Sequence, residues 1–277
     1  MTRRIYRYLP VNHCIYCGAF GSDVPLSNEH IIPYALNGDA VLPAASCATC
    51  ADITSRLERR IIHHDLQPFR LLAGFRTRRP RQRPSVIHEF KFDATANAVT
   101  ERVEIPTEAH PGLLVLPEFE MPGILIGSEP ADGFHNMRLA IWWPNDISER
   151  MNRLEELKVG MIYRESLSLE YFIRFLSKIA HGFAVAEYGF NNFTPYLTDI
   201  ILGKPTTIKT PYIMGGPSGK LPAANVNSMY RVSTSIWMVG EKALLVVKIR
   251  LFSFLVPPAP IYIVVAGEFP DCEFSND

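Results

Sequence analysis

The chain reads Cys14-Ile-Tyr-Cys17-Gly18 near its start and Cys47-Ala-Thr-Cys50 after 29 intervening residues. Two cysteines separated by two residues present both thiolates from one tight turn, and Gly18 favours such a turn. Zinc takes four ligands of this kind at the corners of a tetrahedron. We therefore predict one structural Zn²⁺, fully coordinated and without catalytic function; the alternative is two unrelated pairs of buried thiols.

Between the two cysteine pairs lies Glu29-His30-Ile-Ile-Pro33, in which two polar residues open a short β-prone run. Adjacent residues of a strand point to opposite faces. A carboxylate can hold Mg²⁺, and an imidazole with a near-neutral pKa can take a proton from water. Glu29 and His30 are therefore candidate residues for phosphodiester hydrolysis, although a Glu-His pair alone has little specificity.

Four motifs occur in this order along the chain: the first cysteine pair, Glu29-His30-Ile-Ile-Pro33, Val41-Leu-Pro43 and the second cysteine pair. Together they resemble the HNH endonucleases over residues 14–66. This resemblance implies a ββα-metal fold braced by zinc. It also implies that His30 is the general base and that Glu29 is a ligand of a catalytic Mg²⁺ or Mn²⁺, at a position where most members have Asp.

The sequence departs from the family pattern directly after the last cysteine. Ala51 stands where the family has a final His or Asn, and an alanine side chain cannot ligate a metal. Asp52 is the first candidate to replace it, with Asp39 and Glu58 as further alternatives. A protein with these motifs could thus be an active nuclease or a binding protein without a working nuclease site.

The net charge of zero hides an asymmetry along the chain. Residues 1–90 contain 12 arginines, no lysine and seven acidic residues, a net charge of +5, and the other 187 residues have a net charge of −5. Arginine is suited to bidentate contacts with phosphate, so the positive charge of residues 1–90 favours a polyanionic partner. The candidate nucleic-acid-binding residues are Arg56, Arg59, Arg60, Arg76, Arg78, Arg79, Arg81 and Arg83.

The hydrophobic pattern predicts an α+β protein. Apolar residues at four-residue steps predict a helix after Cys47 that ends before Pro68. A proline-broken basic segment over residues 76–84 marks a boundary between domains at 1–80 and 81–277. We expect the second domain to be a mixed α+β unit of unknown function. Its β-prone runs lie at 85–92, 98–105, 113–116, 123–126, 138–143, 233–239, 243–255 and 261–265, with a short helix over 146–156.

One long amphipathic helix is predicted over residues 165–187, with an apolar stripe that includes Phe172, Ile179 and Phe183. Arg174, Lys178 and His181 share another face of this helix. We expect that face to be solvated or to lie between the domains.

The chain shows no targeting segment and no apolar run long enough to span a bilayer, so a cytoplasmic protein with no membrane partner is expected. The leading hypothesis is a metal-dependent endonuclease acting on DNA, with RNA as an alternative substrate. The competing hypothesis is a catalytically inactive, zinc-stabilised nucleic-acid-binding protein. By analogy with nucleases that carry accessory domains, we further expect the chain to form a homodimer or to bind a partner protein of a bacterial defence system.

Overall fold

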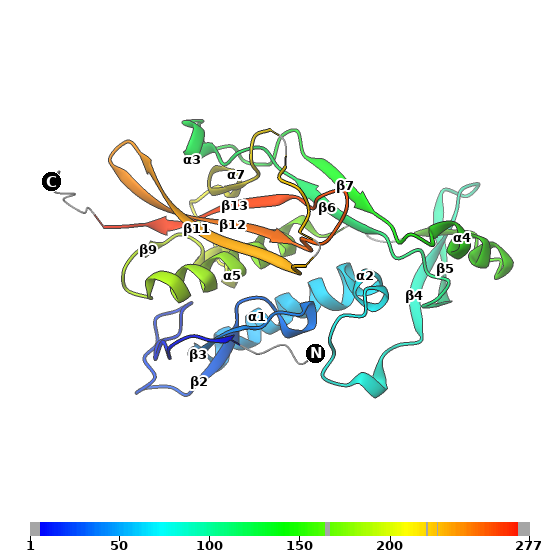
Figure 1. Ribbon diagram of the computed structural model, residues 1–277, viewed down its shortest axis with the longest axis horizontal. Coiled ribbons are helices and arrows are strands. Elements are labelled where there is room, and N and C mark those ends of the chain that lie inside the picture. The colour runs from blue at the N-terminus through cyan, green and yellow to red at the C-terminus, as the bar shows by residue number, and fades with distance from the viewer. Residues whose placement is uncertain (1–5, 164–166, 220, 226, 271–277) are drawn as a thin grey trace.

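A computed structural model describes residues 6–163, 167–219, 221–225 and 227–270. It confirms a mixed α+β architecture, in which a sheet near the C-terminus lies on one side of the long helix α5 (Leu169–Tyr188) and the N-terminal segments lie on the other (Figure 1). No helix in the described ranges is long and apolar enough to cross a membrane.

The N-terminal segment, called the head here (residues 6–84), contains a three-stranded sheet in the order β1-β3-β2. Strand β3 is parallel to β1 and antiparallel to β2, and Glu29 and His30 on β2 lie opposite Leu42 and Val41 on β3. Helix α1 follows β3 directly, because Cys47 ends the strand and caps the helix. The bounds are β1 Tyr6–Arg7, β2 Leu26–His30, β3 Ala40–Cys47 and α1 Ala48–Arg60.

The connection from β2 to β3 requires glycine at one position. A short 3-10 helix, η1 (Tyr34–Leu36), ends at Asn37, which has a left-handed φ of 63°. At Gly38, a Cβ atom would lie 1.9 Å from the carbonyl oxygen of Ile32, so no larger residue fits this close approach. This turn sets the register that places Glu29 and His30 beside β3.

Helix α1 continues into a single π-helical turn and then into a second, short helix with a proline in its first turn. Pro68 lies in the first turn of α2. Proline is tolerated there because an N–H group in the first turn of a helix has no partner within the helix. The predicted helix end before Pro68 therefore corresponds to the junction between these two helices. The bounds are η2 (π-helix) Ile61–Asp65, α2 Gln67–Leu72 and the 3-10 helix η3 Pro80–Gln82.

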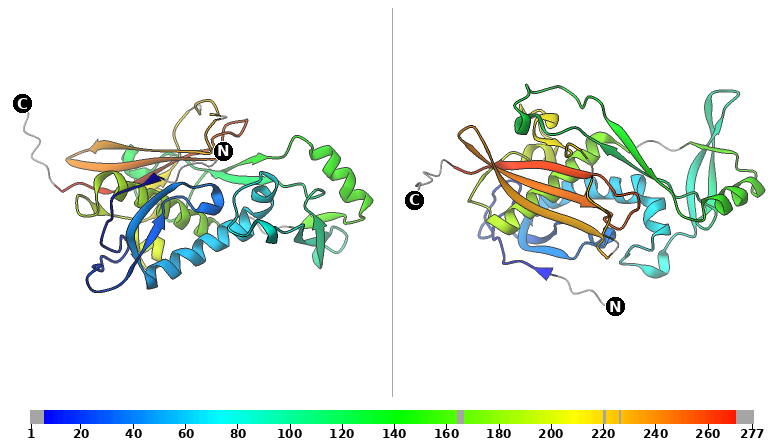
Figure 2. Two further views of the ribbon diagram at one scale, coloured as in Figure 1. Left: turned by 60° about the horizontal axis from the view of Figure 1, so that its bottom comes forward. Right: turned by 45° about the horizontal axis from the view of Figure 1, so that its top comes forward.

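The main sheet of the rest of the chain is antiparallel, in the order β10-β13-β12-β11, with β9 pairing β13. Helix α5 packs against β12 and β13 on one side and against α1 on the other (Figure 2). The bounds are β9 Thr194–Pro195, α6 Thr198–Leu202, α7 Thr210–Ile213, β10 Met214–Gly215, β11 Tyr230–Val239, β12 Lys242–Leu251 and β13 Ile261–Glu268.

A smaller unit extends from one end of the molecule, with a sheet in the order β5-β4-β8 and a small apolar core of its own (Figure 1). Strands β6 and β7 form a separate hairpin-like pair. The bounds are β4 Val86–Asp93, β5 Ala98–Pro106, β6 Leu114–Glu118, α3 Gly123–Ile126, β7 Arg138–Trp142, α4 Ile147–Glu156 and β8 Met161–Tyr163.

The main hydrophobic core runs without interruption from the head to the C-terminal sheet. It joins Cys14 and Leu57 of the head to Phe172 of α5 and Val264 of β13. The division of the chain at residues 80 and 81 stays a prediction, but the two parts share one core.

One prediction about local structure is wrong. Residues 123–126 form the short helix α3 rather than a strand, and Gly127, the residue after this helix, has the left-handed φ that ends many helices.

For the face of α5 that carries Lys178 and His181, the second of the two expected positions holds. Both side chains are fully buried and contact the head rather than solvent. The polar face of this amphipathic helix is therefore covered as well as its apolar stripe.

Candidate metal centre and nucleic-acid interface

The four predicted zinc ligands converge on one point. The Sγ atoms of Cys14, Cys17, Cys47 and Cys50 all lie within 4.8 Å of one another, and those of Cys17 and Cys47 are 3.7 Å apart. Thiolates about 2.3 Å from a tetrahedral zinc ion would lie roughly 3.8 Å from each other. The cluster therefore fits one zinc ion with four thiolate ligands, in agreement with the predicted ligand set.

Backbone hydrogen bonds hold each cysteine pair in place. The amide of Gly18 donates to the carbonyl of Cys14 at 2.8 Å, and Gly18 has a φ of 77°, as expected for the predicted tight turn. The amide of Ile15 donates to Ala45 on β3 at 2.9 Å, which joins this turn to the sheet. Cys47 and Cys50 stand at the N-cap and in the first turn of α1.

Helix α5 contacts the first cysteine turn through a buried histidine. The Nε2 atom of His181 lies 2.5 Å from the carbonyl oxygen of Ile15, the residue after Cys14. Burial lowers the pKa of His181 to about 4, although the hydrogen bond to Ile15 opposes this shift. The ring is therefore neutral at pH 7, and Nε2 carries the proton that it donates to the carbonyl.

The second part of the site is a buried ion cluster centred on Lys178. Its Nζ atom lies 2.7 Å from Oε1 of Glu29 and 2.6 Å from Oε1 of Glu58, and it also donates a hydrogen bond to the carbonyl oxygen of His30. An ammonium has three protons, and each of them has an acceptor here. Strand β2, helix α1 and helix α5 are thus joined at one nitrogen atom.

The protonation states in this cluster follow from burial and charge. Burial favours the neutral amine of Lys178, but the carboxylates of Glu29 and Glu58 outweigh it and raise the pKa of Lys178 above its ordinary value. Burial also raises the pKa of Glu29, with Lys178 opposing and Glu58 reinforcing this shift. One ammonium does not fully compensate two carboxylates in a medium of low polarity.

His30 is half-buried at the end of β2, and its backbone carbonyl belongs to the cluster as an acceptor for Lys178. Burial lowers the pKa of His30, and the nearby charges of Lys178 and Arg78 lower it further. The ring is therefore neutral at pH 7 and can accept a proton.

The residues around Glu29 do not fit a catalytic divalent cation. The carboxylate that the family resemblance assigns to this metal is already paired with Lys178, whose side chain is fully buried between β2 and helix α1. A divalent ion beside Glu29 would stand next to a buried positive charge, which is unfavourable. We derive no chemical step through such a metal.

The candidate replacements for Ala51 lie in different surroundings. Asp52 is exposed on α1 and forms an ion pair with Arg56 one turn further on. Asp39 accepts a hydrogen bond from the hydroxyl of Tyr230 on β11. Of the three candidates, Glu58 is the one that shares a contact atom with Glu29, and that atom is the nitrogen of Lys178.

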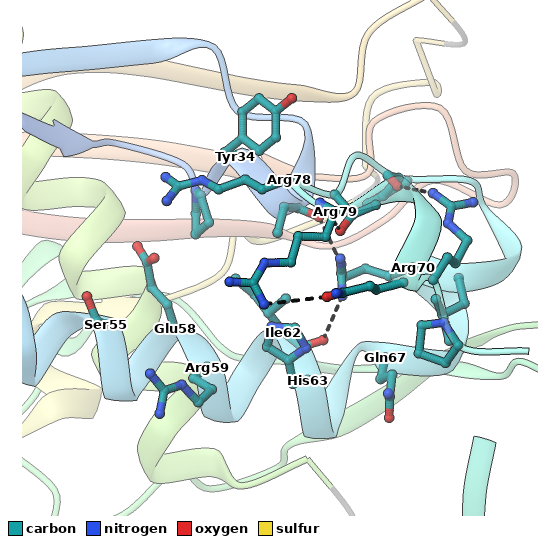
Figure 3. A pocket seen from close by; sticks show the side chains of 18 residues that line it. Tyr34, Ser55, Glu58, Arg59, Ile62, His63, Gln67, Arg70, Arg78 and Arg79 are labelled. Atoms are coloured by element: carbon teal, nitrogen blue, oxygen red, sulfur yellow. Dashed lines mark hydrogen bonds between the residues drawn. The ribbon is translucent and has the colours of Figure 1, made fainter. Parts of the chain in front are cut away.

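Beside this cluster lies a pocket of about 480 Å³ between α1, η2 and the segment of residues 75–84 (Figure 3). Five arginines line it and Glu58 is its single carboxylate. Its lining arginines are Arg59, Arg70, Arg78, Arg79 and Arg83. A concave surface with this charge imbalance can bind a phosphate or a phosphodiester backbone.

Four of the eight arginines predicted to bind nucleic acid line this pocket, and the other four do not. Arg56 pairs with Asp52, and Arg60 and Arg76 lie over the rings of Tyr171 and Tyr34 at 5.9 Å and 5.5 Å. Arg81 is exposed on η3 outside the pocket.

For two residues, Arg70 and Lys178, only the structure shows that they belong to the site. Arg70 is buried and donates to the carbonyls of Ala35, Ile62 and Arg76, so it shapes the pocket wall rather than offering a free cation. Lys178 lies far along the chain from the head, and its spacing to His181 indicated a shared helix face without indicating its partner.

Comparison of the chain with family models, with curated proteins and with solved structures gives no match. The resemblance to HNH endonucleases therefore depends on the quoted motifs. The structure supports it in one respect, the cluster of four cysteines that could bind zinc.

Proposed function

We propose that the protein is a zinc-stabilised nucleic-acid-binding protein, whose head contacts the phosphate backbone through the arginine-lined pocket. The observation that carries this proposal is the gathering of five arginines around one concave surface with a single carboxylate. Arg59, Arg78 and Arg79 are exposed there. Contacts of this kind bind phosphate in any sequence context and give affinity that depends strongly on salt.

Two features of the site support binding rather than hydrolysis. Ala51 offers no metal ligand, and Glu29 is already paired with Lys178. The zinc cluster would hold the cysteine turn and α1 together, so that the pocket wall formed by α1 is rigid before a ligand arrives.

Fluorescence anisotropy with a labelled DNA duplex, and with single-stranded DNA and RNA of the same length, tests this proposal. At low salt, the double variant Arg78→Ala/Arg79→Ala is expected to bind about tenfold or more weakly than the wild type. Arg102→Ala, which removes an exposed arginine from β5, is the matched control and is expected to bind normally. Equal binding by all three proteins would count against the pocket, and no binding by any of them would count against the function.

A second candidate function is the HNH-type endonuclease activity that the motifs suggest. The observation in its favour is His30, which is half-buried at the end of β2 with a pKa low enough to be neutral at pH 7. In this reading His30 takes a proton from the attacking water, and the arginines hold the neighbouring phosphates.

A plasmid-nicking assay with Mg²⁺ or Mn²⁺ distinguishes the two functions. Nicking that requires the metal and disappears in His30→Ala would establish the nuclease. We expect binding without nicking in both the wild type and His30→Ala, because Glu29 is already paired.

A further inference from the structure

We propose that the ammonium of Lys178 takes the place of a divalent cation in the head, and that removing this ammonium opens a divalent-cation site between Glu29 and Glu58. In the wild type, Mg²⁺ and Mn²⁺ are then excluded from this position. The inference does not rest on nucleic-acid binding, so it can fail or hold independently of the proposed function.

The ligands around the Lys178 nitrogen are those of a hard cation. Two carboxylate oxygens, from Glu29 and Glu58, lie 2.7 and 2.6 Å from it, and the carbonyl oxygen of His30 completes the set. All three are oxygen atoms, and carboxylate and carbonyl oxygens are the ligands that Ca²⁺, Mg²⁺ and related ions prefer. The same three atoms could therefore accept a small divalent ion.

The acceptors and the cation come from different parts of the chain. Glu29, His30 and Glu58 belong to β2 and α1 of the head, whereas Lys178 belongs to α5. The head thus supplies an oxygen-lined position with negative charge, and a helix from outside it supplies the positive charge. A bound metal ion would perform the same task of joining β2 to α1.

In the wild type, burial prevents a metal ion from replacing the ammonium of Lys178. The Lys178 side chain is completely buried, and Glu29 is nearly so. The ammonium cannot swing into solvent to admit another ion without unpacking α5, and two cations at one buried position would repel each other. Exchange of lysine for metal therefore requires a substitution.

The test uses the full-length, zinc-loaded protein and Mn²⁺ as the probe. In Lys178→Ala, the missing side chain leaves space beside Glu29 and Glu58. We expect Mn²⁺ to raise the thermal unfolding midpoint of this variant by about 5 °C or more at saturation, and the electron paramagnetic resonance signal of free Mn²⁺ to decrease on mixing. The wild type is expected to show neither effect.

The matched control is Lys178→Ala/Glu29→Gln/Glu58→Gln, which has the same cavity without the carboxylates and is expected not to respond to Mn²⁺. Two results would overturn the inference. One is Mn²⁺ binding by the wild type that Glu29→Gln abolishes, and the other is a folded Lys178→Ala variant that ignores Mn²⁺.

Lys178→Ala could fail to fold without a cation, and refolding then provides the test. Denatured Lys178→Ala is diluted into buffer with Zn²⁺, with and without Mn²⁺, and its far- and near-ultraviolet circular dichroism is compared with that of the wild type. Refolding that depends on Mn²⁺ supports the inference. Failure to refold in both conditions, while the triple variant refolds, contradicts it, because the carboxylates then destabilise the fold even with a metal available.

Discussion

The Nζ atom of Lys178 on helix α5 lies 2.7 Å from Oε1 of Glu29 on strand β2, and both side chains are buried. This contact joins the part of the chain that carries the four clustered cysteines to the helix that supports the C-terminal sheet. It also determines what Glu29 can do, because a carboxylate held by a buried ammonium is not available as a metal ligand.

Replacing Lys178 with Met should strongly destabilise the protein. The methionine keeps most of the side-chain volume but leaves Glu29 and Glu58 without their cation. Breaking a buried ion pair in this way costs about 3–5 kcal/mol. Urea denaturation of the wild type and the variant measures the difference in the free energy of unfolding.

The control for this prediction is Lys242→Met. Lys242 forms an ion pair of similar length with Glu268, at 2.8 Å, but its side chain is largely exposed. An exposed pair contributes about 1 kcal/mol or less, so this variant should unfold close to the wild type. Equal losses in the two variants would show that burial of Lys178 has no special importance.

The stability lost in Lys178→Met should depend on pH. Burial raises the pKa of Glu29 even with Lys178 present, and removal of the ammonium should raise it further. A carboxyl group whose folded-state pKa is raised is tolerated when protonated at low pH and destabilises the fold as pH rises through that pKa.

The difference between wild type and variant should therefore shrink as the pH falls from about 8 towards about 5.5. Thermal unfolding of both proteins across this range measures it. Adding Glu29→Gln to Lys178→Met should remove most of the pH dependence. A difference that stays constant or grows towards acid would contradict this assignment of the buried charge.

Zinc should be bound at about one ion per chain and should be required for a stable head. Cys50→Ser removes one of four thiolates that lie within 4.8 Å of one another, and we expect it to lose zinc and to unfold at a lower temperature. Metal analysis of the purified protein measures the stoichiometry. Cys272→Ser is the control, since Cys272 belongs to neither of the two cysteine pairs and lies outside the residues that the structure describes. Substoichiometric zinc in the wild type would refute the metal centre.

Gly38→Ala should disrupt the turn between β2 and β3. The added methyl group would lie 1.9 Å from the carbonyl oxygen of Ile32, so the backbone must shift. We expect a loss of about 1–3 kcal/mol, typical of overpacking, measured by denaturant unfolding. Gly133→Ala is the matched control because no atom lies near its Cβ position, and a loss as large there would point to a general effect of removing glycine.

The local features of the head could be predicted from the sequence because their signals are local. Two residues between the cysteines of each pair fix a tight turn, and Gly18 adopts the left-handed conformation expected there. The helix after Cys47 follows from apolar residues at four-residue steps, and its helical run through Asp65 ends before Pro68, as expected. These features require no knowledge of distant residues.

The partner of Glu29 could not be predicted, because it depends on tertiary packing. Lys178 has helical spacing with His181, and a polar face on an amphipathic helix usually meets water. Here that face meets a carboxylate pair and two backbone carbonyls of the head, which compensate its burial. Sequence patterns reveal that a face is polar but not whether another element supplies its partners.

From the sequence, only the arginine-rich composition of the pocket could be predicted. The basic segment of residues 76–84 indicated a polyanion partner, and Arg78, Arg79 and Arg83 do line a pocket with Arg59. Arg56 and Arg60 lie on the same helix as Arg59 but engage Asp52 and Tyr171. Which charges remain available depends on neighbours that charge counting does not identify.

The salt dependence of DNA binding tests the central claim most directly, because it counts the phosphate contacts. If Arg59, Arg78, Arg79 and Arg83 each contact a phosphate, the logarithm of the binding constant should fall with the logarithm of salt concentration with a slope of about −3.6. In Arg78→Ala/Arg79→Ala the slope should become shallower by about 2. An unchanged slope in this variant, or binding by the wild type that does not depend on salt, would contradict a phosphate-binding pocket at this site.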